Sequence, residues 1–159
     1  MAQVAGAAAL ISGATWFALG ENWIFFGILH SIAVSSLLGL AVLRWPAAIL
    51  LILAAGVFVL PRLLRSDAFG SPALIWLGLG TTPVYAADFP PVFPWFAPVL
   101  AGIALAKITA RLNLWSAWSR IQGPMIGRLG WPGRHSLIIY LIHQPILIGI
   151  IWLVTKLIR

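Results

Sequence analysis

Cysteine is absent from this sequence, and charge is scarce. Without a thiol, the chain forms no disulfide, holds no thiolate-bound metal and has no cysteine nucleophile. Charged residues make up 8% of the chain, with three acids against ten bases, whereas a soluble domain carries about a quarter. A Gly-rich phosphate loop, a nucleophile elbow and paired carboxylates are also missing, so none of these three kinds of site is predicted.

Hydrophobic residues take the place of charge. They make up 62% of the chain, and the mean hydropathy is +1.03. Nine tryptophans and eleven prolines complete the composition of an integral membrane protein, in which interfacial Trp and intramembrane Pro are both common. The basic residues stand singly at the ends of apolar runs. The net charge of +7 therefore indicates membrane loops, and nucleic-acid binding is not predicted.

Five apolar segments are present, judged by the need for about 20 residues to cross a bilayer. They cover residues 2–19, 23–43, 46–64, 93–108 and 135–158. We therefore predict an all-α integral membrane protein, a bundle of about five transmembrane helices that forms one domain over residues 1–159.

Two longer connections separate the last three segments. The first, residues 65–92, contains an apolar stretch at 71–80 that is too short to span and is expected to pack at the interface or re-enter. Over residues 81–96 no regular helix is expected, because of Pro83, Pro90, Pro91 and Pro94. The second connection, residues 109–132, mixes arginine with tryptophan, as in segments that lie on lipid headgroups.

The basic residues favour one orientation, with the N-terminus in the cytoplasm and the C-terminus outside. The cytoplasmic side would hold six of them: Arg44, Lys107, Arg111, Arg120, Arg128 and Arg134. The other side would hold the remaining four, with all three acids: Arg62, Arg65, Lys156, Arg159, Glu21, Asp67 and Asp88. The N-terminal flank has no basic residue, which fits either an internal helix with absent upstream neighbours or a naturally neutral start.

The fifth segment carries the densest polar chemistry. Ser136, Tyr140 and Gln144 are four residues apart and form one stripe of a helix, with His143 beside them. Pro145 lacks a backbone donor and frees a carbonyl near His143. Facing lipid would be costly for these side chains, so we expect a donor-rich pocket inside the bundle. At its cytoplasmic mouth stand two residues suited to a phosphate or carboxylate, Arg134 and His135.

The second segment contributes His30, beside a small face made by Gly27 and Ser31. That face is expected to let another helix approach closely. An ionisable residue inside a membrane is a functional candidate, so His30 and His143 are both considered; the alternative for each is a hydrogen bond between packed helices. Asp88 lies in a proline-rich loop, where it serves either as a turn or cap or as a ligand. Three histidines without a local spacing motif predict no metal site.

Three stretches carry a family resemblance: "WIFFGILHSIAVSSLLGL", "DFPPVFPWFAPVLAGIALA" and "LGWPGRHSLIIYLIHQPILIGIIWL". In order and spacing they resemble the bacterial branch of the heparan-alpha-glucosaminide N-acetyltransferase catalytic-domain family. The most specific part is Arg134-His135-Ser136 followed by Tyr140, His143, Gln144 and Pro145. Shorter forms of this ending also occur in other membrane acyltransferases.

The resemblance implies a multi-pass enzyme of the bacterial inner membrane that moves an acetyl group from acetyl-CoA to a sugar amine or hydroxyl. Acetyl-CoA is then a co-substrate, no cofactor is permanently bound, and the partners are the bilayer and a sugar or glycan acceptor; a homo-oligomer is left open. In the family a histidine is given the central role in transfer, here His143 or His30. The substrate- and CoA-binding candidates are Arg134, His135, Tyr140, Gln144, Asp88 and Arg128.

The sequence also departs from the family pattern, because the basic flank and the early His-containing stretch do not precede Met1. The resemblance thus implies the C-terminal portion of an acetyltransferase-like domain, with about two helices absent upstream and doubtful activity of this chain alone. His143 would be the proton acceptor or would orient the absent histidine. Two other functions remain open, a non-catalytic membrane subunit and a small transporter. The internal symmetry common in transporters is lacking.

Overall fold

The computed structural model describes residues 2–86, 88–114, 116 and 130–158, which form helices and turns without a strand. The chain divides into two compact units, Met1–Leu114 and Trp115–Arg159. An all-helical fold is confirmed for the described residues. Arg128, and most of the connection predicted to lie on headgroups, fall outside them.

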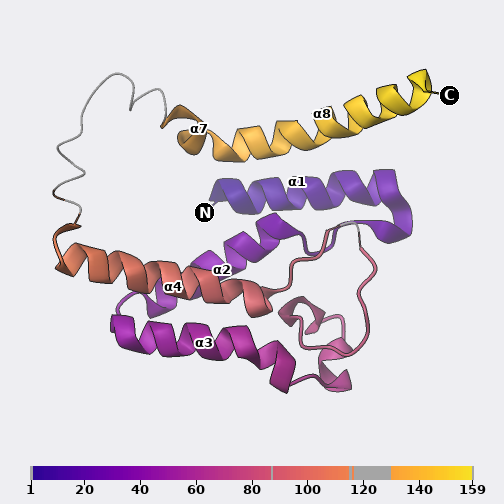
Figure 1. The fold of residues 1–159 in the computed structure, drawn as a ribbon. Coiled ribbons are helices and arrows are strands. Elements are labelled where there is room, and N and C mark those ends of the chain that lie inside the picture. The colour runs from indigo at the N-terminus through magenta and orange to yellow at the C-terminus, as the bar shows by residue number, and fades with distance from the viewer. Residues whose placement is uncertain (1, 87, 115, 117–129, 159) are drawn as a thin grey trace. The chain divides into compact units, whose positions relative to one another are not determined.

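The first unit begins with three helices: α1 (Ala2–Leu19), α2 (Ile28–Val42) and α3 (Ala47–Leu63) (Figure 1). Their bounds agree closely with the predicted segments, except that α2 begins five residues later than expected. Gly27 precedes it in extended conformation, so residues 23–27 are a turn and not a helical start. Helix α3 is built from Ala and Leu, which form helices readily, and follows Pro46, whose fixed φ suits a helix start.

Helix α4 (Val92–Arg111) is longer than the predicted 93–108. It begins inside the proline-rich stretch, so the expectation of no regular helix over residues 81–96 is wrong at its C-terminal end. The prolines still distort the start of the helix. Phe93 has φ −96° and ψ 127°, outside the helical region, because the residue before Pro94 is sterically driven from it. Beyond this kink, proline in the first turn costs no hydrogen bond.

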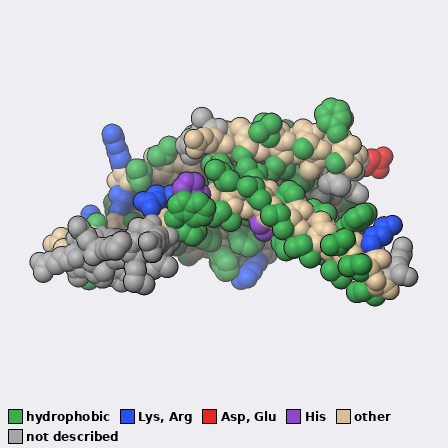
Figure 2. Space-filling view, turned by 90° about the horizontal axis from the view of Figure 1, so that it is seen from above, with side chains coloured by type: hydrophobic (Ala, Val, Ile, Leu, Met, Phe, Trp, Pro, Cys, Tyr) green, Lys and Arg blue, Asp and Glu red, His purple; other side chains and the backbone are tan. Residues whose placement is uncertain are grey.

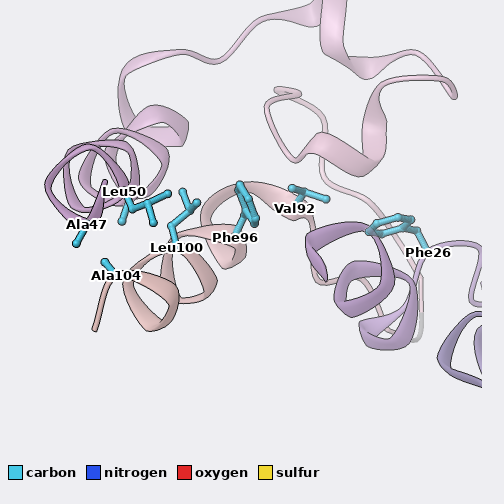
Figure 3. Packing of buried hydrophobic residues seen from close by; sticks show 8 residues of the cluster. Phe26, Ala47, Leu50, Val92, Phe96, Leu100 and Ala104 are labelled. Atoms are coloured by element: carbon cyan, nitrogen blue, oxygen red, sulfur yellow. The ribbon is translucent and has the colours of Figure 1, made fainter. Parts of the chain in front are cut away.

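The core of the first unit lies between α3 and α4, which run side by side (Figure 1). Helix α3 contributes residues at spacings of three and four, and α4 contributes one residue in every four, which gives each helix one apolar face. Leu50 and Leu100 point toward each other at the centre, and both are fully buried (Figure 3). At the end nearest Val92, the core continues to Phe26, just before α2.

A segment that we call the cap, residues 64–91, connects α3 to α4. Its described residues include two short 3-10 turns, Asp67–Gly70 and Ile75–Leu77, which agrees with the expectation that residues 71–80 are too short to span. Aromatic contacts hold the cap against the start of α2: the Phe26 and Trp76 rings are 6.0 Å apart, and the Phe25 and Phe89 rings 5.5 Å. The cap therefore covers the end of the unit where α2 begins.

The second unit contains a short helix, α7 (Trp131–Arg134), and a long one, α8 (Ser136–Leu157). Helix α8 matches the predicted fifth segment and carries exposed apolar side chains along its length. Figure 2 shows hydrophobic side chains of the described residues over much of the surface that is visible in that view. By length and composition, α4 and α8 are long and apolar enough to cross a membrane, and α1, α2 and α3 are shorter apolar helices. Five crossings therefore stay a prediction.

Candidate functional site

A carboxylate from the cap lies on the first turn of α2. Asp88 Oδ2 accepts a hydrogen bond from the Ile28 backbone N–H at 2.9 Å. The first amides of a helix have no partner within the helix, and the helix dipole makes this end partly positive. Asp88 gives one of these amides a hydrogen-bond partner and also places a negative charge at the positive end of the helix. The structure thus gives it the cap role that the sequence left as one of two alternatives, and it places the carboxylate beside a candidate histidine.

His30 is half-buried in the same turn of α2 as Ile28, whose amide holds the Asp88 carboxylate. Its Nδ1 accepts the Gly27 backbone N–H at 3.3 Å, and its Nε2 lies 3.5 Å from the Ser12 hydroxyl of α1. Ser12 donates its own proton to the Ile24 carbonyl at 2.6 Å. These partners assign the neutral tautomer with hydrogen on Nε2, so the basic nitrogen Nδ1 faces the end of α2 where Asp88 lies.

This arrangement suits proton transfer better than nucleophilic attack. A serine nucleophile must give its proton to the histidine, but the Ser12 hydroxyl points to a backbone carbonyl and accepts from Nε2. Nδ1 is held only by a long hydrogen bond, which an incoming N–H or O–H group can replace. The imidazolium that would form is then stabilised by the nearby carboxylate.

Gly27 permits the close approach of the cap to α2. A Cβ at this position would lie 2.6 Å from Ile24 Cγ2 and 2.8 Å from Asp88 Oδ2. The small face predicted to admit another helix therefore admits a side chain of the cap at Gly27, and the expectation of a helix neighbour is wrong there. The reason is that α2 begins only after Gly27, so this residue belongs to the turn and not to the helical stripe.

We expect Gly27→Ala to displace the Asp88 carboxylate and to lower the thermal stability of the purified chain by a few degrees, because overpacking costs about 1–3 kcal/mol. Gly102→Ala in α4 is the matched control, since a Cβ there meets nothing within 4 Å. Differential scanning fluorimetry in detergent measures both. Equal melting temperatures for the two variants would show that the close contact is not maintained.

A cavity of about 270 Å³ lies between α2 and α4. One side carries the buried Ser31 and Ser35, and the other carries Trp95, which is 59% exposed. Ile28 and Pro90 also line the cavity, so it opens beside the residues that hold Asp88. A row of hydroxyls facing an indole is suited to a polar molecule with an apolar face. We call this space the α2–α4 groove.

The second unit holds the other predicted residues. His143 is exposed within it and pairs its Nδ1 with the Tyr140 carbonyl at 2.7 Å, while the two rings lie 5.6 Å apart. His135 stacks on Trp131 with ring centroids 4.7 Å apart, directly before α8. Arg134 ends α7, and the Gln144 side chain lies outside the described side chains. In the structure, Asp88 and His30 lie at the same end of α2, and His143 contacts Tyr140.

The model of the heparan-alpha-glucosaminide N-acetyltransferase catalytic family matches residues 1–145. The chain belongs to this family. The match spans both units, including His30, Asp88, Arg134 and His143. Membership in the acetyltransferase family implies acetyl-CoA as co-substrate and a sugar as acceptor. The searches of curated proteins and of solved structures found no match.

Two residues of the site were not predicted. Ser12 lies 18 positions before His30, in an apolar helix, and nothing in its local sequence indicates the contact. Trp95 was given no role from the sequence, because its position in the groove depends on how α4 packs against α2. Among the described residues no three His, Asp or Glu gather as a metal site.

Proposed function

We propose that this chain belongs to a membrane acetyltransferase in which His30 accepts the proton of a sugar amine or hydroxyl. The observation that carries the proposal is that His30 and the Asp88 carboxylate meet at the start of α2, where His30 Nδ1 accepts from the Gly27 amide and Asp88 Oδ2 accepts from the Ile28 amide. Family membership supplies the reaction class. The cluster supplies a base whose protonated form has a carboxylate beside it.

The reaction balances through these groups. An acceptor bound at the start of α2 would pass its N–H or O–H proton to His30 Nδ1 as its nitrogen or oxygen attacks the acetyl carbonyl. A C–N or C–O bond forms, the C–S bond of acetyl-CoA breaks, and the CoA thiolate takes up a proton. Asp88 holds the imidazolium during the step. Because Asp88 is itself held by the Ile28 amide, it is positioned before the substrate arrives.

The remaining sequence predictions belong to the same proposal. Arg134 and Arg128 would hold the phosphates of CoA, with His135, Tyr140 and Gln144 nearby along α8. The helices would cross the inner membrane five times, and the N-terminal end of α8, which follows Arg134, would face the cytoplasm, where acetyl-CoA is made.

Transfer of a radiolabelled acetyl group from acetyl-CoA to glucosamine tests the proposal. Proteoliposomes should contain this chain and, in a parallel sample, the chain together with any in-frame coding sequence upstream. Label on the sugar that depends on protein and on the acceptor supports the proposal. If neither protein transfers label to an amino sugar or to a neutral sugar, the assignment fails.

We expect His143→Leu to insert into the membrane at wild-type level and to lower transfer by about 10²-fold, the low end of an acid–base contribution. Removing an intramembrane polar group improves insertion, so a loss of transfer cannot come from poor insertion. Immunoblots of membrane fractions and the acetyl-transfer assay measure the two effects. A fully active His143→Leu protein would identify this histidine as a packing residue.

A further inference from the structure

Arg65 is fixed at the end of α3 by its own side chain. Its Nε donates to the Pro61 carbonyl at 3.1 Å, one of the last helix carbonyls without a partner in the helix. This bond uses one of five N–H donors and leaves the two terminal amino groups available. Among the described residues Arg65 has no acidic partner.

Arg65, an exposed residue, lines a cavity of about 330 Å³ inside the cap. Thr82 lines the same cavity, and its hydroxyl has no hydrogen-bond partner in the part of the chain that the structure describes. Phe89 and Pro91 provide apolar walls. Asp67 does not line the cavity, and its carboxylate accepts a hydrogen bond from the Thr81 hydroxyl. The cavity therefore has a positive wall, a free hydroxyl and an apolar side.

The cavity has a defined shape, because the cap backbone closes on itself. The Ser66 amide donates to the Leu79 carbonyl at 3.1 Å, and this bond joins the start of the cap to the end of the apolar stretch. Gly78, at φ +81°, sits directly against Pro91 and the Phe93 carbonyl. The lining is thus held by contacts that do not involve Arg65 itself.

We propose that this cavity binds a phosphate group on a small organic molecule, with Arg65 as the anchoring cation. A planar guanidinium with two amino groups free matches the oxygens of a phosphate, and a hydroxyl beside it adds a third donor. The apolar walls suit the carbon part of the same molecule. Two sources carry such a group, a phospholipid headgroup and a soluble sugar phosphate. The site is separate from the His30–Asp88 pair and does not depend on the proposed function.

Native mass spectrometry of the purified chain tests the site without acetyl-CoA. The probes are phosphatidylglycerol against diacylglycerol, and glucose 6-phosphate against glucose. We expect at least one phosphate-bearing probe to bind, and Arg65→Gln to weaken it by about tenfold or more, since a hydrogen bond to a charged group contributes about that much. The probe that binds identifies the source as lipid or soluble.

Arg62→Gln is the matched control. Arg62 lies three residues earlier in the last turn of α3, with its guanidinium 5.0 Å from the Phe58 ring, and it does not line the cavity. Thr82→Val removes the hydroxyl while keeping the shape, and it should weaken the same probe less than Arg65→Gln does. The proposal is overturned if the wild type and the Arg65 and Thr82 variants bind the probe equally. It is also overturned if Arg62→Gln loses as much binding as Arg65→Gln does, or if neither phosphate probe binds.

Discussion

Replacing His30 by glutamine is expected to lower acetyl transfer by about 10²–10⁴-fold, the contribution of a positioned acid–base group. Glutamine keeps a side chain that can form hydrogen bonds with Gly27 and Ser12, but it accepts no proton at neutral pH. The loss should appear in kcat, with little change in the KM for acetyl-CoA, because the cluster contacts the acceptor proton and not the nucleotide.

Two further variants show whether a loss of activity comes from lost proton transfer or from lost folding. Asp88→Asn keeps an oxygen for the Ile28 amide and removes the charge, so it should reduce kcat while the melting temperature stays near that of the wild type. Ser12→Ala loses only the hydroxyl at 3.5 Å and should keep most of the activity. If His30→Gln retains wild-type kcat in protein that transfers acetyl, His30 is not the proton acceptor, and His143 becomes the remaining candidate.

Gly78→Ala is expected to be the most destabilising single-methyl change in the described part of the chain. Gly78 has φ +81°, a conformation that costs other residues about 1–3 kcal/mol. Its new Cβ would lie 2.3 Å from Pro91 Cβ and 2.8 Å from the Phe93 carbonyl oxygen, and relieving this overlap costs about 1–3 kcal/mol more. Neither neighbour is a flexible side-chain end, so the cap backbone itself would have to move.

The measurement is the unfolding temperature of the purified chain in detergent, followed by tryptophan fluorescence. Gly56→Ala in α3 is the control, because a Cβ there meets nothing within 4 Å and alanine favours the helix. Gly78→Ala should unfold at a temperature several degrees lower, and the cavity beside Arg65 should lose its phosphate-bearing probe at the same time. Matching unfolding temperatures would mean that the cap does not hold Gly78 in this conformation.

The sequence predicted the helices well because their signal is local. Apolar runs and flanking prolines placed α1, α3 and α8 within about two residues of their observed ends. The errors arose where local rules compete. At Gly27 an apolar run continued through a turn, and at Pro94 a proline cluster did not prevent a helix, because its first turn needs no backbone donors.

The candidate site was predicted only as separate residues. His30 and Asp88 were both named, but 58 positions separate them, and no periodicity connects a helix to a loop so far along the chain. Their common place at the start of α2 depends on the cap folding back across the end of this helix, which involves the turn at Gly78 and the aromatic contacts of Phe26. The contact to Ser12 depends on a third element in the same way.

The apolar core and the candidate binding residues lie in different parts of the chain, and this separation has an evolutionary consequence. The apolar core is made chiefly by α3 and α4, whereas Asp88 and the cavity beside Arg65 belong to the connection between them or border it. Loops accept substitutions, insertions and deletions far more readily than packed helices do. Substitutions in the cap can therefore alter the cavity beside Arg65 while the helices stay as they are, so relatives with matching helices and divergent caps should differ in the ligand that this cavity binds.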